Sequence, residues 1–279
     1  LSMISPPAAR SAERVLLALG GVLLALASSA CTEPAPEMLR IPFEARAFGV
    51  EPACDAPHRV GPRAEPLVLH DLRFFVHDVR LVMADGSVQR ARLVPDGRFQ
   101  TREVALLDFE DGTGACTQGS AGKNTELRIE APRGVVRELR FAVGVPFAPN
   151  HANPALAEGP LTAGTLHWGW RGGYKFVRFE ARFGERMHRL HLGSTRCEGS
   201  FAHVTSCGRP NRAEVALPAF RPGRRVRVSL DAFLGDGPDL DCMAAEDDAA
   251  CAPHFAALGL DPSSGRSTRA SSLFTWSEP

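Results

Sequence analysis

The sequence has 279 residues, and its 32 Lys plus Arg balance its 32 Asp plus Glu, so the formal net charge at pH 7 is zero. Hydrophobic residues make up 44% and charged residues 23%, a mixture typical of a globular rather than a disordered chain. The balanced charge and the lack of a basic stripe with interleaved aromatic residues argue against binding to nucleic acid or to acidic lipid.

Residues 1–30 have the pattern of a secretory signal peptide. Two arginines precede an apolar run over residues 15–27, which is short for a bilayer-spanning helix, and three small residues follow it. Cys31 comes next, so we expect either a lipidated N-terminus or an ordinary cleaved signal; Ser28, where lipoprotein signals usually carry Leu, argues against lipidation. Residues 31–38 are then a tether, and the chain is expected in the periplasm or at the outer cell surface.

The rest of the sequence consists of short β-like runs separated by Gly, Pro and Asp. In residues 41–48 apolar residues alternate with others, as in a strand with one buried face. Asp85-Gly86 lies between runs at 67–83 and 88–94 and predicts a β-hairpin, because both turn residues tolerate positive φ. Further strands are expected at 104–109, 125–129, 138–145, 166–170, 174–181, 187–192, 213–217 and 225–231.

This series of strands without intervening helices predicts an all-β fold, a two-sheet antiparallel β-sandwich. Helical periodicity is weak except in residues 244–258, where a short helix is expected. With no internal repeat and no clear linker, residues 39–260 are expected to form one domain. The tail at 261–279 is Ser-rich and expected to be loose, although Phe274 and Trp276 could form a last edge strand.

The cysteines predict disulfides that brace this sandwich. Besides Cys31 there are six, an even number, and an even set in an exported chain favours disulfides. Their short spacings favour two local bridges and leave the first two cysteines for each other, giving Cys197–Cys207, Cys242–Cys251 and Cys54–Cys116. Zinc is the weaker alternative, because no C-x-x-C occurs and the spacings suit no common zinc module.

Five of the nine histidines lie between residues 150 and 203, and imidazole is a ligand that suits copper and zinc. His188 and His191 share one expected strand, where residues three apart point to opposite faces, so they are not expected to bind one ion together. We favour His191, because the turn residues that follow it indicate a strand end. His151 follows Pro-Asn in an expected loop, where the pleat does not dictate its direction.

Two other features are open to a functional interpretation. Trp168 and Trp170 would share one face of a regular strand, and on the residue pattern alone they are more simply interpreted as core aromatics. Asp108, Glu110 and Asp111 suggest a solvated acidic turn, with calcium as a weaker alternative.

We expect the protein not to be an enzyme. The sequence contains no G-x-S-x-G, no H-E-x-x-H and no phosphate-binding loop. A secreted hydrolase is a weak alternative, because Ser194 beside His191 is its only candidate nucleophile.

Several strings, in this order, make the sequence resemble the MbnP family, also called the four-Cys protein of the metallo-mystery pair. They are LRFFVHDVRL (72–81), LLDFE (106–110), VGVPF (143–147), PNH (149–151), WGWRGGYKF (168–176), HLGST (191–195) before Cys197, and C-x-x-PNR (207–212). The resemblance implies an exported copper-binding protein, with a di-haem cytochrome c peroxidase-like partner, MbnH, that oxidises one tryptophan to kynurenine. It spans roughly residues 40–235.

Carried over to this sequence, the resemblance implies that His151 and His191 hold copper, as Cu(I), beside a modified Trp168 or Trp170. The four-Cys set would be Cys54, Cys116, Cys197 and Cys207, with Cys242 and Cys251 as additions. The alternative from a different class is a metal-free structural or adhesion β-sandwich, in which the two histidines lie far apart.

Overall fold

The computed structural model describes residues 36–200, 203–234, 240–242 and 249–277. The expected signal peptide and the lipidation candidate Cys31 lie outside the described residues. Within those ranges no helix is both long and apolar enough to cross a bilayer.

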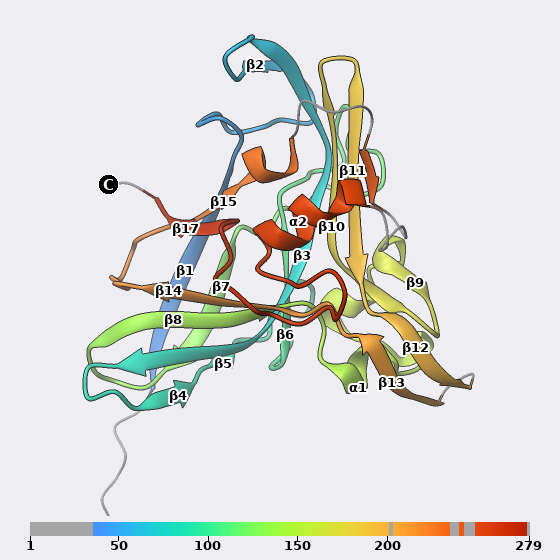
Figure 1. The fold of residues 1–279 in the computed structure, drawn as a ribbon. Coiled ribbons are helices and arrows are strands. Elements are labelled where there is room, and N and C mark those ends of the chain that lie inside the picture. The colour runs from blue at the N-terminus through green and yellow to red at the C-terminus, as the bar shows by residue number, and fades with distance from the viewer. Residues whose placement is uncertain (1–35, 201–202, 235–239, 243–248, 278–279) are drawn as a thin grey trace, which may run out of the picture. The chain divides into compact units, whose positions relative to one another are not determined.

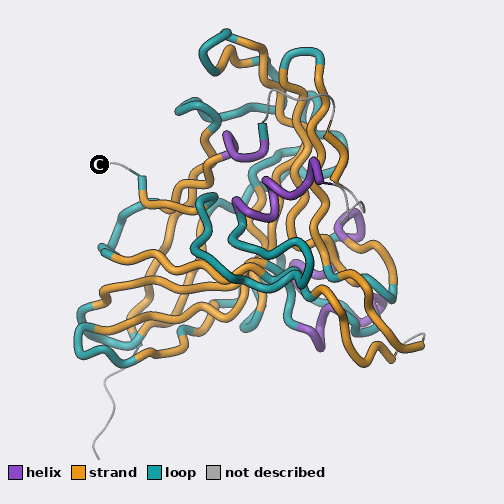
Figure 2. The backbone as a smooth tube through the Cα atoms, viewed as in Figure 1, coloured by secondary structure: helices purple, strands orange, loops and turns teal. Residues whose placement is uncertain are grey.

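Strand is the main secondary structure of the described chain, arranged in two large sheets and one small ribbon (Figures 1 and 2). The ten-stranded sheet contains β2 (His58–Val60), β3 (Glu65–Met83), β4 (Val88–Arg90), β6 (Val104–Asp108), β8 (Val136–Val143), β9 (His167–Gly169), β10 (Gly173–Phe183), β11 (Arg186–Gly193), β14 (Ala213–Pro218) and β16 (Leu240–Cys242). The five-stranded sheet contains β1 (Glu37–Arg46), β5 (Arg92–Leu93), β7 (Glu126–Ala131), β15 (Val226–Ser229) and β17 (Phe274–Trp276). The ribbon pairs β12 (Thr195–Ser200) with β13 (His203–Arg209).

Within the described ranges, helical structure is confined to short segments. These are α1 (Phe147–Asn150), α2 (Ala252–Ala257) and the 3-10 turns η1 (Pro154–Leu156), η2 (Gly159–Thr162), η3 (Gly164–Leu166), η4 (Leu230–Phe233) and η5 (Ala249–Cys251). The expected C-terminal helix is confirmed as α2, although residues 244–248 of the predicted segment lie outside the described residues. The all-β fold class is confirmed as well. Pairing is mostly antiparallel, but β1–β15 and β11–β16 are parallel.

The main core lies between the two large sheets. Phe43 of β1 and Phe274 of β17 come from the smaller sheet, and their rings meet those of Phe74 on β3 and Phe141 on β8. Ring centroids are 5.4–6.2 Å apart in edge-to-face contacts, the arrangement that aromatic quadrupoles favour. On β8 and β17 the core phenylalanines are followed or preceded by exposed residues such as Arg140 and Thr275, as expected for a sandwich.

The longest strands, β3 and β10, are buried on both faces. On β10 the side chains of Val177 and Phe179 enter the main core, while Tyr174 and Phe176 belong to a second apolar cluster with Phe75 of β3. Further along the same second face lie charged side chains, which form a buried ion network; its members are Asp71, Arg73, Arg178 and Glu180. Burial on two faces explains why these strands read as near-continuous runs rather than as alternating ones.

Two sequence expectations are wrong for the described residues. The tail is not loose: both Leu273 and Phe274 are 2% exposed, and the last edge strand expected at Phe274 and Trp276 is confirmed as β17, which pairs with β15. The acidic turn is not solvated at two of its three positions, since Asp108 and Glu110 are buried. Burial, and then the charge of Glu110, raise the pKa of Asp108 to about 8, so this carboxyl group is largely protonated at neutral pH.

The hairpin at Asp85-Gly86 is confirmed. Strands β3 and β4 pair antiparallel across it, Gly86 has φ of 85°, and its backbone N–H donates to the Met83 carbonyl at 3.0 Å. Glycine meets no steric penalty at this backbone angle.

All three expected disulfides are present, Cys54–Cys116, Cys197–Cys207 and Cys242–Cys251. The first joins cysteines 62 positions apart and the second joins cysteines 10 apart. In the chain-entropy model, restriction of the unfolded chain stabilises the fold by about 4 kcal/mol for the longer loop and about 3 kcal/mol for the shorter one.

We therefore expect the Cys54→Ser/Cys116→Ser variant to lose about 1.6 kcal/mol more unfolding free energy than Cys197→Ser/Cys207→Ser, before both values are rounded. Urea denaturation of both variants beside the parent protein measures this difference. A larger loss from the shorter loop would contradict the entropic explanation.

Candidate metal centre

His191 lies near the end of β11. One of its ring nitrogens is hydrogen-bonded, and the other has no hydrogen-bond partner among the described residues. Its Nε2 is 2.7 Å from Glu180 Oε1 on the neighbouring strand β10. Burial alone would raise the pKa of Glu180, but the hydrogen bond from His191 and the charge of Arg178 lower it to about 2. The carboxylate is therefore an acceptor only, and Nε2–H must be the donor.

That tautomer leaves Nδ1 of His191 with its lone pair whenever the ring is neutral. Within the described part of the chain, Nδ1 is buried and has no hydrogen-bond partner. A buried polar atom without a partner calls for an explanation, and a bound ion is one of the possible explanations. An imidazole nitrogen with a free lone pair fits a metal ion, and a carboxylate on the opposite nitrogen is the usual support for a metal-binding histidine.

Trp168 lies directly beside His191. The two ring centroids are 6.4 Å apart, and the indole lies against the end of β11. A Cβ at Gly193 would fall 2.7 Å from Trp168 Cζ3, so glycine at this position is what permits the close approach. Trp168 is 38% exposed and borders a surface pocket of about 590 Å³, which Cys197, Arg171 and neighbouring residues also line.

His151 approaches the same segment from the end of α1. Its Nδ1 is 3.5 Å from the Trp170 carbonyl oxygen, and burial, followed by the charge of Arg212, keeps its pKa below the usual value despite that contact. The neighbouring Asn150 is 1% exposed, accepts a hydrogen bond from Tyr174 N at 2.9 Å and donates one to a backbone carbonyl of the same turn. Asn150 thus fastens the histidine loop to the tryptophan turn.

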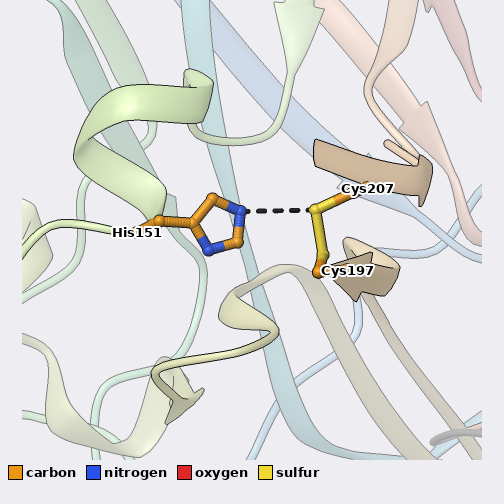
Figure 3. A group of neighbouring side chains, drawn as sticks. All are labelled: His151, Cys197 and Cys207. Carbon is orange, nitrogen blue, oxygen red and sulfur yellow. Dashed lines mark hydrogen bonds between the residues drawn. A yellow bond between two sulfur atoms is a disulfide. The ribbon is translucent and has the colours of Figure 1, made fainter. Parts of the chain in front are cut away.

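The other nitrogen of His151 faces the disulfide of the β12–β13 ribbon (Figure 3). Nε2 lies 3.4 Å from Cys207 Sγ, and the side chain of Asn150 approaches it at 3.1 Å. His151, Cys197 and Cys207 have potential ligand atoms within 4.8 Å of one another, and no other such group of three is found among the described residues.

The structure keeps His188 apart from this region. The His188 ring lies 6.3 Å from Phe183 of the main core, whereas His191 contacts Glu180 on the opposite face of β10. This agrees with the expectation that the two histidines face opposite ways. Trp170 lies beyond the end of β9, and the Arg171 guanidinium is 4.9 Å from its ring. The expectation that Trp168 and Trp170 share one face of a regular strand is therefore wrong.

Both favoured histidines thus border the W-x-W segment, and their assignment as metal ligands remains a prediction. Glu180 and Asn150, which position them, were missed as site residues. Asn150 could have been identified from its place in the Pro-Asn-His string. Glu180 could not, because its contact with His191 depends on the pairing of β10 with β11.

The fold and this region define a disulfide-braced all-β protein with a candidate metal centre. A family model named MbnP matches residues 36–243, and the chain belongs to the MbnP family. The solved structure of MbnP from Methylosinus trichosporium is similar, with a TM-score of 0.71 and 29% sequence identity, over 86% of this chain and 98% of that one. No curated protein matches the chain. Family membership supports a metal-related function.

Proposed function

We propose that this protein binds copper at a centre formed by His191 and His151 beside Trp168, outside the cytoplasm, as a binding protein rather than an enzyme. The observation that carries the proposal is the buried Nδ1 of His191, which has no hydrogen-bond partner within the described residues. Three disulfides support an oxidising compartment.

Glu180 supports the assignment of His191 as a ligand. Its carboxylate holds Nε2–H at 2.7 Å, fixes the ring orientation and increases the basicity of Nδ1. Imidazole nitrogen is a common ligand for copper, and Cu(I) accepts a set of two or three donors. His151 is the second donor in the proposal, and reaching the ion requires its ring to turn away from the Trp170 carbonyl.

We further propose that Trp168, rather than Trp170, is the residue oxidised to kynurenine by a di-haem partner. Trp168 is partly exposed beside a pocket and next to His191, whereas the Trp170 ring is covered by Arg171. The haem partner would use two equivalents of hydrogen peroxide as the oxidant. Two oxygen atoms enter the indole as its C2–C3 bond breaks, and the other two peroxide oxygens become water. Hydrolysis then releases formate and leaves an aniline amine, a nitrogen donor close to His191.

The test is intact and peptide mass spectrometry with copper analysis, on protein expressed alone and with a peroxidase-like di-haem partner. The expected result is a Trp168 peptide that has gained one oxygen and lost one carbon, together with stoichiometric copper, only in the co-expressed protein. Modification of Trp170 instead would reassign the residue. An unmodified, copper-free protein in both preparations would favour the metal-free structural or adhesion alternative.

A further inference from the structure

The disulfide of the β12–β13 ribbon is itself part of a potential metal site. Cys197 and Cys207 face each other directly across the two strands, with Cα atoms 3.8 Å apart. His151, at the end of α1, presents Nε2 to Cys207 Sγ at 3.4 Å (Figure 3). The three groups come from separate segments, so the fold brings them together.

In the oxidised form these sulfur atoms are weak ligands, because the thiolate is the form of cysteine that binds metals. A dithiol reductant would change this. It transfers two electrons and two protons to the Cys197–Cys207 bond, which breaks into two thiols, while the reductant closes its own disulfide. Each thiol loses its proton on binding a metal cation.

We propose that reduction of Cys197–Cys207 creates a second metal site, in which the two thiolates and His151 Nε2 bind one Cu(I) ion. Soft thiolate ligands select Cu(I), and two sulfurs with one nitrogen supply the three donors that it accepts. The site shares only His151 with the proposed centre at His191, and it requires no modified tryptophan.

The distances suit a shared ion. Ligand bonds like those of zinc, about 2.3 Å to sulfur and about 2.0 Å to nitrogen, with three donors about 120° apart, place sulfur and nitrogen roughly 3.7 Å apart. The observed Nε2–Sγ separation of 3.4 Å is already close to that value. The two sulfurs must move apart to roughly 4.0 Å by rotation of their side chains. Nε2 must also give up its 3.1 Å contact with the Asn150 side-chain amide.

This disulfide is also the one a reductant can reach. Cys54, Cys116, Cys242 and Cys251 are between 0% and 6% exposed. Cys207 is half-buried, and Cys197, although only 8% exposed, lines the surface pocket beside Trp168. Arg171 and Arg196 line the same pocket. Nearby cationic groups favour the thiolate form, and therefore both exchange with a reductant and metal binding.

The experiment compares Cu(I) binding by the full chain before and after anaerobic treatment with dithiothreitol, using a chromophoric Cu(I) chelator as competitor. The chain is expressed without a di-haem partner, so that the proposed centre at His191, which also needs His151, holds no copper. After reduction this protein is expected to bind one more Cu(I) per chain than before. That gain should disappear in Cys197→Ser/Cys207→Ser and in His151→Ala. It should persist in the matched control Cys242→Ser/Cys251→Ser and in His191→Ala, which separates this site from the proposed function.

X-ray absorption on the reduced wild-type protein covers the case in which a cysteine variant does not fold. Scattering from two sulfurs and one nitrogen around copper is expected for the additional ion. Equal Cu(I) binding by oxidised and reduced protein, or additional binding that survives Cys197→Ser/Cys207→Ser, would overturn the proposal.

Discussion

Replacing His191 with alanine is expected to abolish stoichiometric copper binding by the Trp-modified protein while leaving the fold intact. The substitution removes an imidazole nitrogen beside Trp168 that is buried and without a hydrogen-bond partner among the described residues. His151→Ala and the double variant are expected to have the same effect, because a two-histidine centre that loses one donor holds copper too weakly for stoichiometric retention. Copper analysis after dialysis against a competing chelator measures the loss.

Glu180→Gln provides a graded form of the same test. An amide oxygen still accepts the bond from Nε2–H, but the negative charge that makes Nδ1 more basic is gone. Loss of such a supporting group typically weakens metal affinity by about 10- to 100-fold, so weakened rather than abolished binding is expected.

His203 is exposed and serves as the control for the histidine variants, since alanine there should change neither copper content nor stability. Copper retention by the double variant His151→Ala/His191→Ala would refute the assignment.

The elements that could be predicted from the sequence are those whose side chains alternate or whose turns have specific chemistry. Strand β1 buries Ile41, Phe43 and Ala45 on one face, in the period of two that the sequence shows. The ribbon of β12 and β13 was missed for the opposite reason. Its residues are mostly polar and exposed, so no apolar pattern marks them, and only the expected Cys197–Cys207 bridge pointed to this pairing.

The candidate site was predictable by residue type but not by its supporting contacts. His191, His151 and the tryptophans could be named from local strings. Glu180 could not, because its role depends on strand register. Asp108 and Glu110 were expected in solvent for a similar reason, since the buried Arg73 that lies 3.9 Å from Glu110 is far away in sequence.

Replacing Asp71 with alanine is expected to lower the free energy of unfolding by about 3–5 kcal/mol, because it leaves two buried cations without their shared partner. Asp71 is 1% exposed, receives Arg73 through bonds of 2.9 and 2.5 Å, and lies 3.0 Å from Arg178 Nε. The matched control is Glu126→Ala. It breaks the Arg40–Glu126 pair, whose side chains are 70% and 31% exposed, and should cost about 0–1 kcal/mol.

Asp71→Ala is also expected to weaken copper binding, because the buried ion network contacts residues of the proposed copper centre. Arg178 connects Asp71 to Glu180, the carboxylate that holds His191. Arg73 and Arg178 also donate to Thr165, three residues before Trp168, at 3.2 and 3.4 Å. Loss of Asp71 therefore loosens the ligand and the tryptophan segment together. Urea denaturation and copper analysis of one preparation test both effects. A loss of stability no greater than that of Glu126→Ala would show that Glu110 and Glu180 suffice to neutralise the two arginines.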